Sequence, residues 1–443
     1  MSTLPYVPPA LQAVLKDTPR KLERRTGFVQ RKSKLDGAAF VQTLTFGWLA
    51  KPDASLDNLA QTAASVGVAI TGQGLDDRFT ESGAQLLDAC LGVAARQVLA
   101  GEPAVIPLME RFAGVYLFDS TQLALPSELK ALWPGSGGGH SPTDGLAALK
   151  LQLGWEFQSG WLLGPFLQAG RTSDRSSPLQ DQLLPAGSLR LTDLGYFDLT
   201  VLRSLSQHGS YWLTRRMART QLSDAQGQSL NLVRFLARQR TLWVDCPVQV
   251  GREEKLAARL VAWRVPPAVA RRRRQNLGKE ARRKAQPVSQ ERQQLAGWTI
   301  VLTNIPPERL KPTEIGIVLR LRWQIELLFK LWKSQGHLDE SRSENPWRQL
   351  CEIYAKLLGL ILQHWILLTH GWQDPARSLV KAGQVIRAHA LELATAFRKG
   401  RPALCQVLEL IARCLVVGCR VNKRKKKPSA FQLWLDPTLQ SLA

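Results

Sequence analysis

Three acidic residues that lie far apart along the chain each occur within or beside an apolar segment, and this arrangement constrains the fold most strongly. Asp119 ends the apolar run of residues 114–118, and Asp193 ends a second strand-like run, residues 188–192. Glu326 instead lies on a long predicted helix. Two acids at strand ends and one on a helix can converge only through the fold. Together they could hold two divalent cations about 3.5–4 Å apart, as in metal-dependent phosphoryl transfer.

The chain carries a large excess of positive charge. Its 443 residues include 59 Lys and Arg against 36 Asp and Glu, a net charge of +23 with a pI near 10.2. Such an excess attracts polyanions, and the release of counterions from a nucleic acid backbone favours binding. Double-stranded DNA is therefore the first partner to expect. An unspecialised basic surface and a membrane-surface protein are the alternatives.

The cysteines and the chain's start give the expected compartment. The six cysteines are scattered without a CxxC pair, so neither a zinc site nor a disulfide framework is predicted. A reducing compartment follows, and we expect a cytoplasmic, nucleoid-associated protein. The first residues lack the pattern of a secretory signal. No GxxxxGK[ST] loop occurs, so no nucleotide cofactor is expected.

One segment is apolar enough to raise the question of a membrane span. Residues 357–368 form the most apolar predicted helix. This segment is too short to cross a bilayer, which needs about 20 residues. We therefore predict a buried core helix, with His364 as a core residue, and no membrane partner.

Changes in the apolar and charge pattern along the sequence predict an α/β protein with five segments. Strands of a mixed sheet alternate with helices in the middle of the chain, and the two ends are helical. The segments are a helical N-terminal DNA-binding region (1–105), the first part of the catalytic core (106–215), a strand-rich basic insertion domain (216–297), the second part of the core (298–372) and a helical basic C-terminal region (373–443).

The N-terminal region contains a possible helix–turn–helix. Ser55 predicts a helix cap, Gly67 a turn, and Thr71 the start of a short helix that runs through Phe79. Such a unit could enter a major groove, but most two-helix stretches are ordinary packing units. The groove-facing residues would be Gln73, Asp76 and Arg78, with phosphate contacts from Arg20, Lys21, Arg24, Arg25, Arg31, Lys32 and Lys34.

Apolar and alternating runs predict the strands. Those of the first core segment are residues 114–118, 146–155, 161–168, 188–192 and 211–214, with a helix over 198–207. Those of the insertion are 230–236, 241–244 and 256–265. The basic run Arg271, Arg272, Arg273 and Arg274 then predicts a helix that faces nucleic acid, with a disordered tail or a localisation signal as alternatives. Residues 298–304 return to a core strand.

The helix with Glu326 is predicted from Pro312 to Ser334. Arg322 lies four residues before Glu326, and Lys333 seven residues after it, so these side chains share one helix face. The acid could bind metal while Arg322, as a fork, and Lys333, as a point charge, contact phosphates. The alternative is a solvated face with Arg–Glu pairing.

Further DNA contacts are predicted near this helix. Lys330 lies on it and adds a phosphate contact. Trp323, Trp298 and Trp263 could stack on an extruded base. Burial against the core is the alternative for each of these rings. The histidines form no close ligand cluster in the sequence.

These motifs together resemble a known family. The pattern Arg322-x3-Glu326-x6-Lys333 resembles the Tyr-Arg-Glu-Lys signature of bacterial insertion-sequence DDE transposases, the group called the IS-four family. Asp119-Ser120-Thr121, Asp193-x-Gly195-Tyr196-Phe197 and the long strand-rich separation between Asp193 and Glu326 also look like that family. The likeness extends from about residue 40 to 370. The signature's tyrosine falls on Leu319, which departs from the pattern.

The resemblance implies a ribonuclease-H-like mixed-sheet core with an inserted β domain. It implies that Asp119, Asp193 and Glu326 bind two Mg²⁺ (or Mn²⁺) ions as the catalytic triad. It also implies binding to terminal inverted repeats and target DNA, a homodimer on DNA, and cut-and-paste movement through hairpin ends. Arg322 and Lys333 carry over as contacts to end phosphates. Leu319 cannot donate a hydrogen bond to a phosphate, so end binding or hairpin handling would be weakened.

The prediction is a DNA transposase, and two other functions stay open. One is a catalytically inactive, transposase-derived repressor that occupies the element's ends. Leu319, in place of the signature's tyrosine, supports this alternative. The other is a structure-specific nuclease on the same core. Metal-dependent strand transfer would separate the transposase from both.

Overall fold

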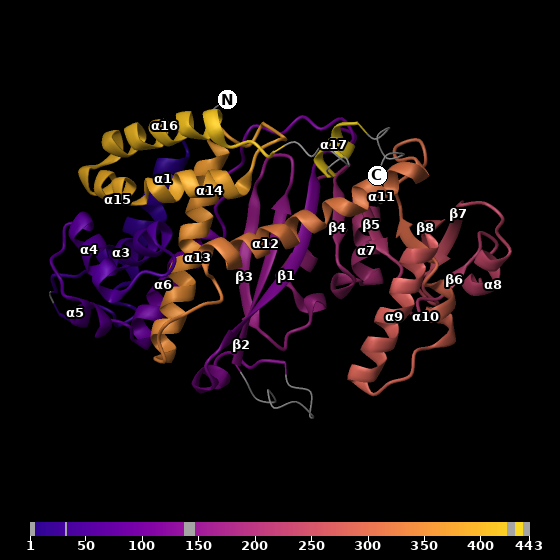
Figure 1. The fold of residues 1–443 in the computed structure, drawn as a ribbon, viewed down its shortest axis with the longest axis horizontal. Helices are drawn as coiled ribbons and strands as arrows, with labels where there is room; N and C mark the ends of the chain where they lie inside the picture. Colours follow the sequence, from indigo (N-terminus) through magenta and orange to yellow (C-terminus); the bar gives the residue numbers. More distant parts are fainter. Residues whose placement is uncertain (1–4, 32, 137–146, 423–429, 437–443) are drawn as a thin grey trace. The chain divides into compact units, whose positions relative to one another are not determined.

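The structure, a computed structural model, describes residues 5–31, 33–136, 147–422 and 430–436 (Figure 1). The predicted contact Lys32 and the basic end, residues 423–427, lie outside them. The chain divides into two compact units. The first comprises Met1–Ile106, Asp119–Thr172 and Trp323–Phe431, and the second comprises Pro107–Phe118, Ser173–Arg322 and Gln432–Ala443. Strand β1 (Val115–Leu125) contributes residues to both units.

The first unit is mainly helical. Its N-terminal elements are α1 (Val7–Gln12), the π-helical turn η1 (Ala13–Asp17), α2 (Thr18–Leu22), α3 (Gly37–Ala50), α4 (Leu56–Val66), α5 (Gly72–Asp76) and α6 (Glu81–Ala94). Its middle elements are the end of β1, the turn η2 (Ser127–Ala131), β2 (Ala147–Glu156) and β3 (Leu162–Ala169). Its last helices are α12 (Trp323–Gly336), α13 (Pro346–Leu368), α14 (Leu379–Ala388), α15 (Ala390–Lys399) and α16 (Arg401–Gly418). The short α17 (Ala430–Leu435) begins in this unit and ends in the second.

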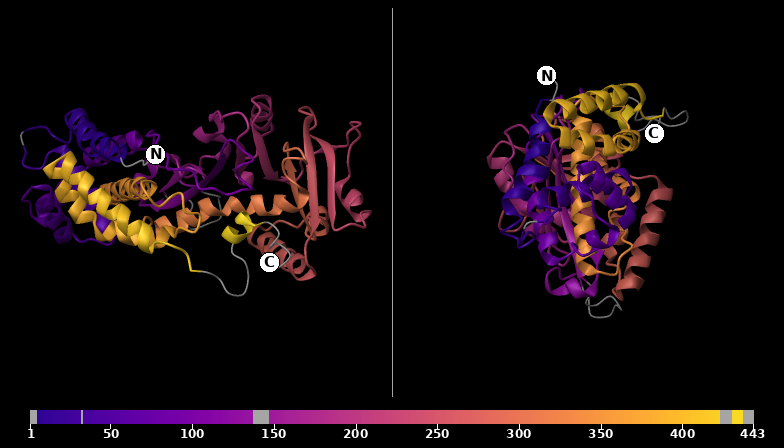
Figure 2. Two further views of the ribbon diagram at one scale, coloured as in Figure 1. Left: turned by 90° about the horizontal axis from the view of Figure 1, so that it is seen from above. Right: turned by 90° about the vertical axis from the view of Figure 1, so that its left-hand side faces the viewer.

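Helix α13 forms the core of the first unit. It begins at an Asn345 cap with Pro346 at its first position, which suits a helix start, and every residue from Leu350 to Leu368 is buried. Helices α3 and α6 pack against it, and α14, α15 and α16 lie side by side (Figure 2). At 23 residues, α13 is long and apolar enough to cross a membrane, but its apolar window is fully buried in the protein. The length argument against a span was therefore wrong, while the predicted core helix is confirmed.

The second unit is built on strands. Its elements are the start of β1, the turns η3 (Asp174–Ser176) and η4 (Pro178–Asp181), β4 (Leu189–Thr192), the turn η5 (Leu194–Tyr196), α7 (Leu199–Gln207), β5 (Tyr211–Arg215), β6 (Leu222–Ser223), α8 (Leu232–Ala237), β7 (Trp243–Val250), β8 (Leu256–Arg264), α9 (Pro267–Lys284), α10 (Gln290–Leu295), β9 (Trp298–Thr303) and α11 (Pro312–Leu321). Every residue of β4 is buried, as expected for a strand between parallel neighbours.

The strands form one mixed sheet in the order β3-β2-β1-β4-β5-β9-β8-β7-β6. Strands β1, β4 and β5 are parallel, with Val115 opposite Leu189 and Phe118 opposite Thr192. Strand β9 returns antiparallel to β5, and β8, β7 and β6 continue antiparallel from it. Strands β2 and β3 form an antiparallel pair at the other end of the order. The mixed sheet with helices confirms the predicted α/β class.

Local signals predicted several boundaries correctly. Ser55 caps α4 in a capping box with Asn58, Gly67 ends that helix with a positive φ of 100°, and Thr71 caps α5. The basic run after β8 is helical, as α9. Helix α5 ends at Asp76, so the prediction of a helix to Phe79 was too long.

Three predicted elements were wrong in part. Residues 230–236 were predicted as a strand, but Asn231 caps helix α8, in which Leu232 and Leu236 are buried four residues apart. Strand β1 continues six residues beyond Asp119, because Leu123 and Leu125 alternate into the core. The single helix from Pro312 to Ser334 is two helices, α11 and α12, separated by Arg322.

Candidate active site and nucleic acid interface

The two aspartates each follow a residue of one pair on neighbouring parallel strands. Phe118 of β1 pairs with Thr192 of β4, and the next residue on each chain segment is an aspartate. Asp119 is half-buried, and its Oδ1 accepts a hydrogen bond of 2.8 Å from the backbone amide of Ser120. Asp193 is exposed and precedes the turn η5. Asp119 thus lies within a strand, whereas Asp193 directly follows one as predicted.

An acid that sequence reasoning missed, Asp174, lies beside Gly195, two residues after the second aspartate. In the turn after Asp193, a Cβ at Gly195 would lie 2.6 Å from Oδ2 of Asp174, so a larger residue there would displace this carboxylate. Asp174 is on η3, and the sequence offers no motif that would have singled it out. Burial lowers the pKa of Arg190 on β4 to about 10, and its guanidinium lies 4.9 Å from the centre of the Phe118 ring.

Glu326 lies in the first turn of α12, where the helix dipole favours a negative charge. Its side chain is half-buried. Helix α12 is tied to β1 by a hydrogen bond of 2.9 Å from Lys333 Nζ to the carbonyl oxygen of Gln122. This contact lies within the first unit, three residues beyond Asp119. It could not be predicted from spacing, because it joins residues 211 positions apart.

The other predicted contacts on this helix differ in exposure. Trp323 is 52% exposed, so the alternative of burial was wrong for this ring. Nζ of the exposed Lys330 lies 5.6 Å from the centre of that ring. Arg322 is half-buried between the two helices, with helical backbone angles, and it belongs to the second unit. Leu319, in the signature's tyrosine position, is half-buried on α11.

The acids supply oxygen donors of the kind that Mg²⁺ and Mn²⁺ prefer. Among the described residues, no three His, Cys, Asp or Glu side chains are grouped as a metal-ligand set. Asp119 and Glu326 belong to the first unit and Asp193 to the second. The metal triad therefore stays a prediction.

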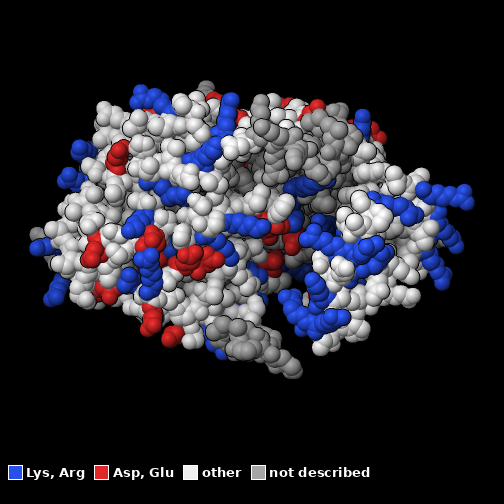
Figure 3. Space-filling view, in the orientation of Figure 1, with Lys and Arg blue, Asp and Glu red and all other residues white. Residues whose placement is uncertain are grey.

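Helix α9 presents the predicted basic run. Arg271, Arg272 and Arg274 are exposed, and Figure 3 shows Lys and Arg side chains gathered over this part of the second unit. Arg273 instead anchors the helix to β9 by bonds to the Trp298 carbonyl (2.8 Å) and Thr299 Oγ1 (2.9 Å). Burial, followed by the nearby charge of Arg215, lowers the pKa of this guanidinium. Arg274 Nε also donates to the Gln293 carbonyl of α10 at 3.2 Å. The helix thus has two arginines that bond its neighbours, while Arg271, Arg272 and Arg274 are exposed to a polyanion.

A cavity of about 320 Å³ opens between α9, α10 and the ends of β5 and β9. Its wall includes Arg215, Arg216 and Arg292, which sequence reasoning missed, and Leu194, which directly follows Asp193. Glu291 pairs with Arg216 at 2.9 Å. The cavity is therefore rich in guanidinium groups, as an anion site requires. Trp298 lines it but is only 9% exposed, with Arg264 over its ring at 4.6 Å.

A second basic hollow lies in the first unit, at the predicted helix–turn–helix. A groove of about 800 Å³ runs between residues 27–31 and 33–35 and the segment of α5. Arg31, Lys34 and Arg78 line it, and Arg78 Nη2 donates to Ser33 Oγ at 3.3 Å. Asp76 was predicted to face DNA, yet it pairs with Arg348 at 3.0 Å.

One histidine, His364, lies in the core of the first unit. His364 is buried and its Nε2 lies 2.6 Å from the Gly160 carbonyl oxygen. Burial lowers its pKa to about 4, which confirms the predicted core role. All six cysteines are free thiols, in line with a chain without disulfides.

A family model matches the region that contains the three predicted carboxylates. Residues 110–362, more than half of the chain, match the family model described as Transposase DDE domain. The matched range contains Asp119, Asp193 and Glu326. It also contains residues 216–297, the predicted insertion.

Several curated proteins are similar over much of their length. The transposase for insertion sequence element IS231F of Bacillus thuringiensis subsp. israelensis is 26% identical over 81% of this chain and 79% of its own. That for IS231B of Bacillus thuringiensis subsp. berliner is 24% identical over 93% and 91%. A solved piggyBac transposase synaptic complex with hairpin DNA aligns over 97% of this chain and 87% of its own, with 10% identity and a TM-score of 0.47. That score is too low to assign a fold.

Proposed function

The chain belongs to the Transposase DDE domain family, and we propose that Asp119, Asp193 and Glu326 are the carboxylates that carry its chemistry. It is a DNA transposase of the insertion-sequence type, an enzyme that cleaves and transfers DNA strands. The observation that carries the assignment is the register of β1 and β4. Because Phe118 pairs with Thr192, the aspartates that follow continue two neighbouring parallel strands, which lie about 4.8 Å apart.

The third carboxylate is supported by the contact between α12 and β1. The bond from Lys333 to the Gln122 carbonyl ties the helix of Glu326 to the strand of Asp119. Three carboxylates of this kind fit two Mg²⁺ or Mn²⁺ ions, which when bound supply an activated oxygen nucleophile and stabilise the leaving oxygen. The protein's own task is to hold the carboxylates and the DNA phosphates in line for displacement.

The cations on and before α12 are proposed to bind the phosphates of the transposon end. Arg322 offers a planar fork, and Lys330 and Lys333 offer point charges. Trp323 is proposed to stack on a base, since its ring is half exposed. We assign Trp298 no stacking role as it stands, because Arg264 covers its buried ring.

Two further surfaces are proposed to bind DNA. The exposed arginines of α9 suit the backbone of a duplex, and the arginine-lined cavity beside Leu194 suits a single phosphate. In the first unit, the groove with Arg31, Lys34 and Arg78 supports the N-terminal segment as the region that binds the terminal inverted repeats. Phosphate contacts at these surfaces position the DNA without reading its sequence.

The finer architecture is also a proposal. The β2–β3 hairpin on one side of β1 and the parallel strands β4 and β5 on the other, with one aspartate on β1 and one after β4, support a ribonuclease-H-like core. We extend to this chain action as a homodimer on DNA, cut-and-paste movement through hairpin ends, and a cytoplasmic, nucleoid-associated location. These three proposals rest on the similarity of the chain to insertion-sequence transposases.

The test is an Asp119→Asn variant in a cleavage assay on DNA that carries the element's ends. Cleavage with Mg²⁺ should fall by on the order of 10³-fold or more, while DNA affinity stays within about threefold, since the loss concerns charge at the metal site. Asp181→Asn, an exposed aspartate on η4, is the matched control and should cleave normally. Full cleavage by Asp119→Asn would refute the assignment. Cleavage that ignores end sequence and yields no strand transfer would favour a general nuclease.

A further inference from the structure

The segment that joins β9 to α11, residues 305–310, is bonded to arginines from two other parts of the second unit. We propose that Arg259 and Arg111 are positioning residues that hold this segment, and through α11 fix the place of Arg322. The inference rests on the proposed phosphate contact of Arg322. It concerns residues of the second unit alone.

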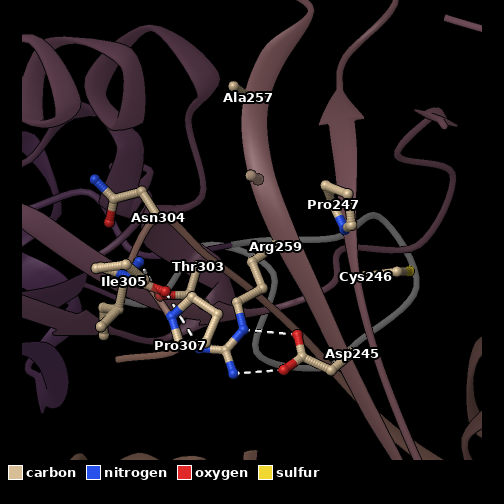
Figure 4. A pocket seen from close by; sticks show the side chains of 11 residues that line it. Asp245, Cys246, Pro247, Ala257, Arg259, Thr303, Asn304, Ile305 and Pro307 are labelled. Carbon is tan, nitrogen blue, oxygen red and sulfur yellow. Dashed lines mark hydrogen bonds and ion pairs between the residues drawn. The ribbon is translucent and has the colours of Figure 1, made fainter. Parts of the chain in front are cut away.

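Arg259 reaches the segment from strand β8 of the insertion. Its guanidinium forms a two-pronged ion pair with Asp245 of β7, with Nε and Nη2 each 2.6 Å from a carboxylate oxygen (Figure 4). Its Nη1 donates to the carbonyls of Ile305 (3.3 Å) and Leu310 (2.8 Å), at the two ends of the segment. Arg259 is only 7% exposed, and a cavity of about 380 Å³ opens beside the pair. A buried guanidinium with all these bonds has one orientation, so the carbonyls it binds are held in place.

Arg111 binds the same region from the segment that leads into β1. Its Nη1 and Nη2 donate to the two carboxylate oxygens of Glu314 at 2.7 and 2.9 Å, and Nη1 also donates to the Arg309 carbonyl at 3.1 Å. Arg309 in turn donates to the Arg111 carbonyl. Glu314 accepts a third bond, 2.9 Å, from the Lys311 amide, which closes the first turn of α11.

The start of α11 therefore determines where its end lies. Residues 315–318 and Leu321 are buried, so the helix packs as one rigid rod. From Lys311 to Arg322 the rod is about 16 Å long, and a tilt of about 5° at its start moves Arg322 by about 1.4 Å. A shift of this size at a phosphate contact slows a reaction on the order of tenfold to a hundredfold. Neither arginine touches DNA in this role, since each acts through α11.

The experiment is a double-mutant cycle between Arg259→Lys and Arg322→Ala in single-turnover cleavage of end-containing DNA. Lysine keeps the charge but cannot span both Asp245 oxygens and two carbonyls. Arg259→Lys alone should slow cleavage at least tenfold. In the Arg322→Ala background it should slow cleavage less than twofold, because the contact that it positions is already gone. Equal slowing in both backgrounds, or no slowing in either, would overturn the positioning role.

Controls separate this result from misfolding and from a failure of the proposed function. Arg264→Lys is the matched control on the same strand, since Arg264 bonds the Gln239 carbonyl within the insertion, and it should cleave normally. Thermal unfolding shows which variants fold. If Arg259→Lys does not fold, Asp245→Asn, which weakens the same pair and preserves its shape, takes its place in the cycle. Full cleavage by Asp119→Asn in the same assay would refute the metal triad, whereas additive rates would refute only the role of Arg259.

Discussion

The two units differ in emphasis: the first is centred on one long buried helix and the second on arginines that join distant segments, although the first unit also contains the Lys356–Glu352 and Arg348–Asp76 pairs. In the first unit, α13 is buried along most of its 23 residues and contacts α3 and α6. In the second unit, arginines join segments that are distant in the sequence, as Arg259 does with Asp245 and Leu310 and Arg111 with Glu314. Apolar burial is non-directional, whereas a guanidinium bond fixes direction as well as distance.

The difference bears on the residues proposed to act in each unit. The first unit, which holds the proposed carboxylates Asp119 and Glu326, gains free energy of folding from buried area. The second unit, which holds the proposed Asp193 and Arg322, gains fixed geometry from bidentate arginine bonds. The predictions below test whether the first unit depends on packing and the second on charge.

The largest expected effect on stability is a cavity in α13. Leu358 is fully buried, so Leu358→Ala should lower the free energy of unfolding of the first unit by about 2–5 kcal/mol. Leu391 on α15 is 46% exposed, and Leu391→Ala should cost less than about 0.5 kcal/mol. Hydrogen exchange of α13 amides measures the loss where it occurs. Similar losses for the two variants would contradict the packing description of this unit.

His364 makes the first unit sensitive to acid. Its folded pKa of about 4 lies below the ordinary value of 6.5, because burial disfavours the charged ring. Between about pH 6.5 and 4 the unfolded chain binds the proton and the folded chain does not, so stability falls as pH falls. The loss amounts to about 3 kcal/mol once pH reaches the folded pKa.

His364→Gln tests this assignment, because glutamine can still donate to the Gly160 carbonyl but does not titrate. The difference in unfolding free energy between pH 7 and pH 4 should shrink by about the same 3 kcal/mol. His389→Gln, at a half-buried histidine that pairs with Glu392, is the control. An unchanged pH profile in His364→Gln would show that other groups cause the acid sensitivity.

Glu314 gives the matching test of charge in the second unit. Burial raises the pKa of this carboxyl, but the bonds from Arg111 and the Lys311 amide outweigh it and lower the pKa below 4.5. Its stabilisation is therefore present above pH 4.5 and is lost as pH falls through the lowered folded pKa. Glu314→Gln should cost about 1–2 kcal/mol at pH 7, a modest value because Arg111 is 37% exposed and partly screened.

The measurement is hydrogen exchange of α11 amides at pH 7, with the exposed Glu308→Gln as control. Added salt at 1 M should reduce the cost of Glu314→Gln, because screening weakens the pair in the wild type. The cost of Leu358→Ala should not fall with the same salt. If both costs respond alike, the two units do not differ in the way proposed.

Much of the fold could be predicted because local chemistry agreed with the final structure. Ser55, Thr71 and Asp198 each cap the helix that follows, and alternating apolar residues marked β2, β3 and β8. Residues 230–236 failed because a short apolar run fits both periods, and the Asn231 cap was the signal that decided for a helix. The break between α11 and α12 at Arg322 could not be predicted from local sequence, since the backbone angles of Arg322 stay helical.

The site was predictable only in its residue types. The motif around Asp193 and Gly195 could be recognised, but Asp174 beside Gly195 comes from a different turn. The bond between Lys333 and Gln122 and the bonds of Arg259 to residues 305 and 310 join distant parts of the chain. Helical periodicity and strand alternation carry no information about such pairs. Tertiary packing decides them.

The smallest expected effect concerns the exposed arginines of α9. Their replacement tests the contribution of surface charge apart from that of the internal ion pairs. Replacing Arg271, Arg272 and Arg274 by Gln should weaken DNA binding less than about tenfold at 0.15 M salt, because exposed charges contribute little each. The salt dependence is the sharper measurement. The slope of log Kd against log salt concentration should fall by about 0.9 for each arginine that contacts a phosphate. Unfolding should change little, since Arg273, which anchors the helix to β9, is untouched and the lost Arg274 bond to the Gln293 carbonyl is exposed.

The control for α9 removes the same charge from the first unit. Lys399, Arg401 and Arg413 are exposed on α15 and α16, so their replacement by Gln lowers the net charge equally. If α9 contacts DNA, the slope of log Kd against log salt concentration falls only in the α9 variant. An equal fall in both variants would mean that the net charge of the protein, and not a surface of the second unit, attracts DNA. In that case arginine would serve the second unit only through internal bonds such as those of Arg111 and Arg259.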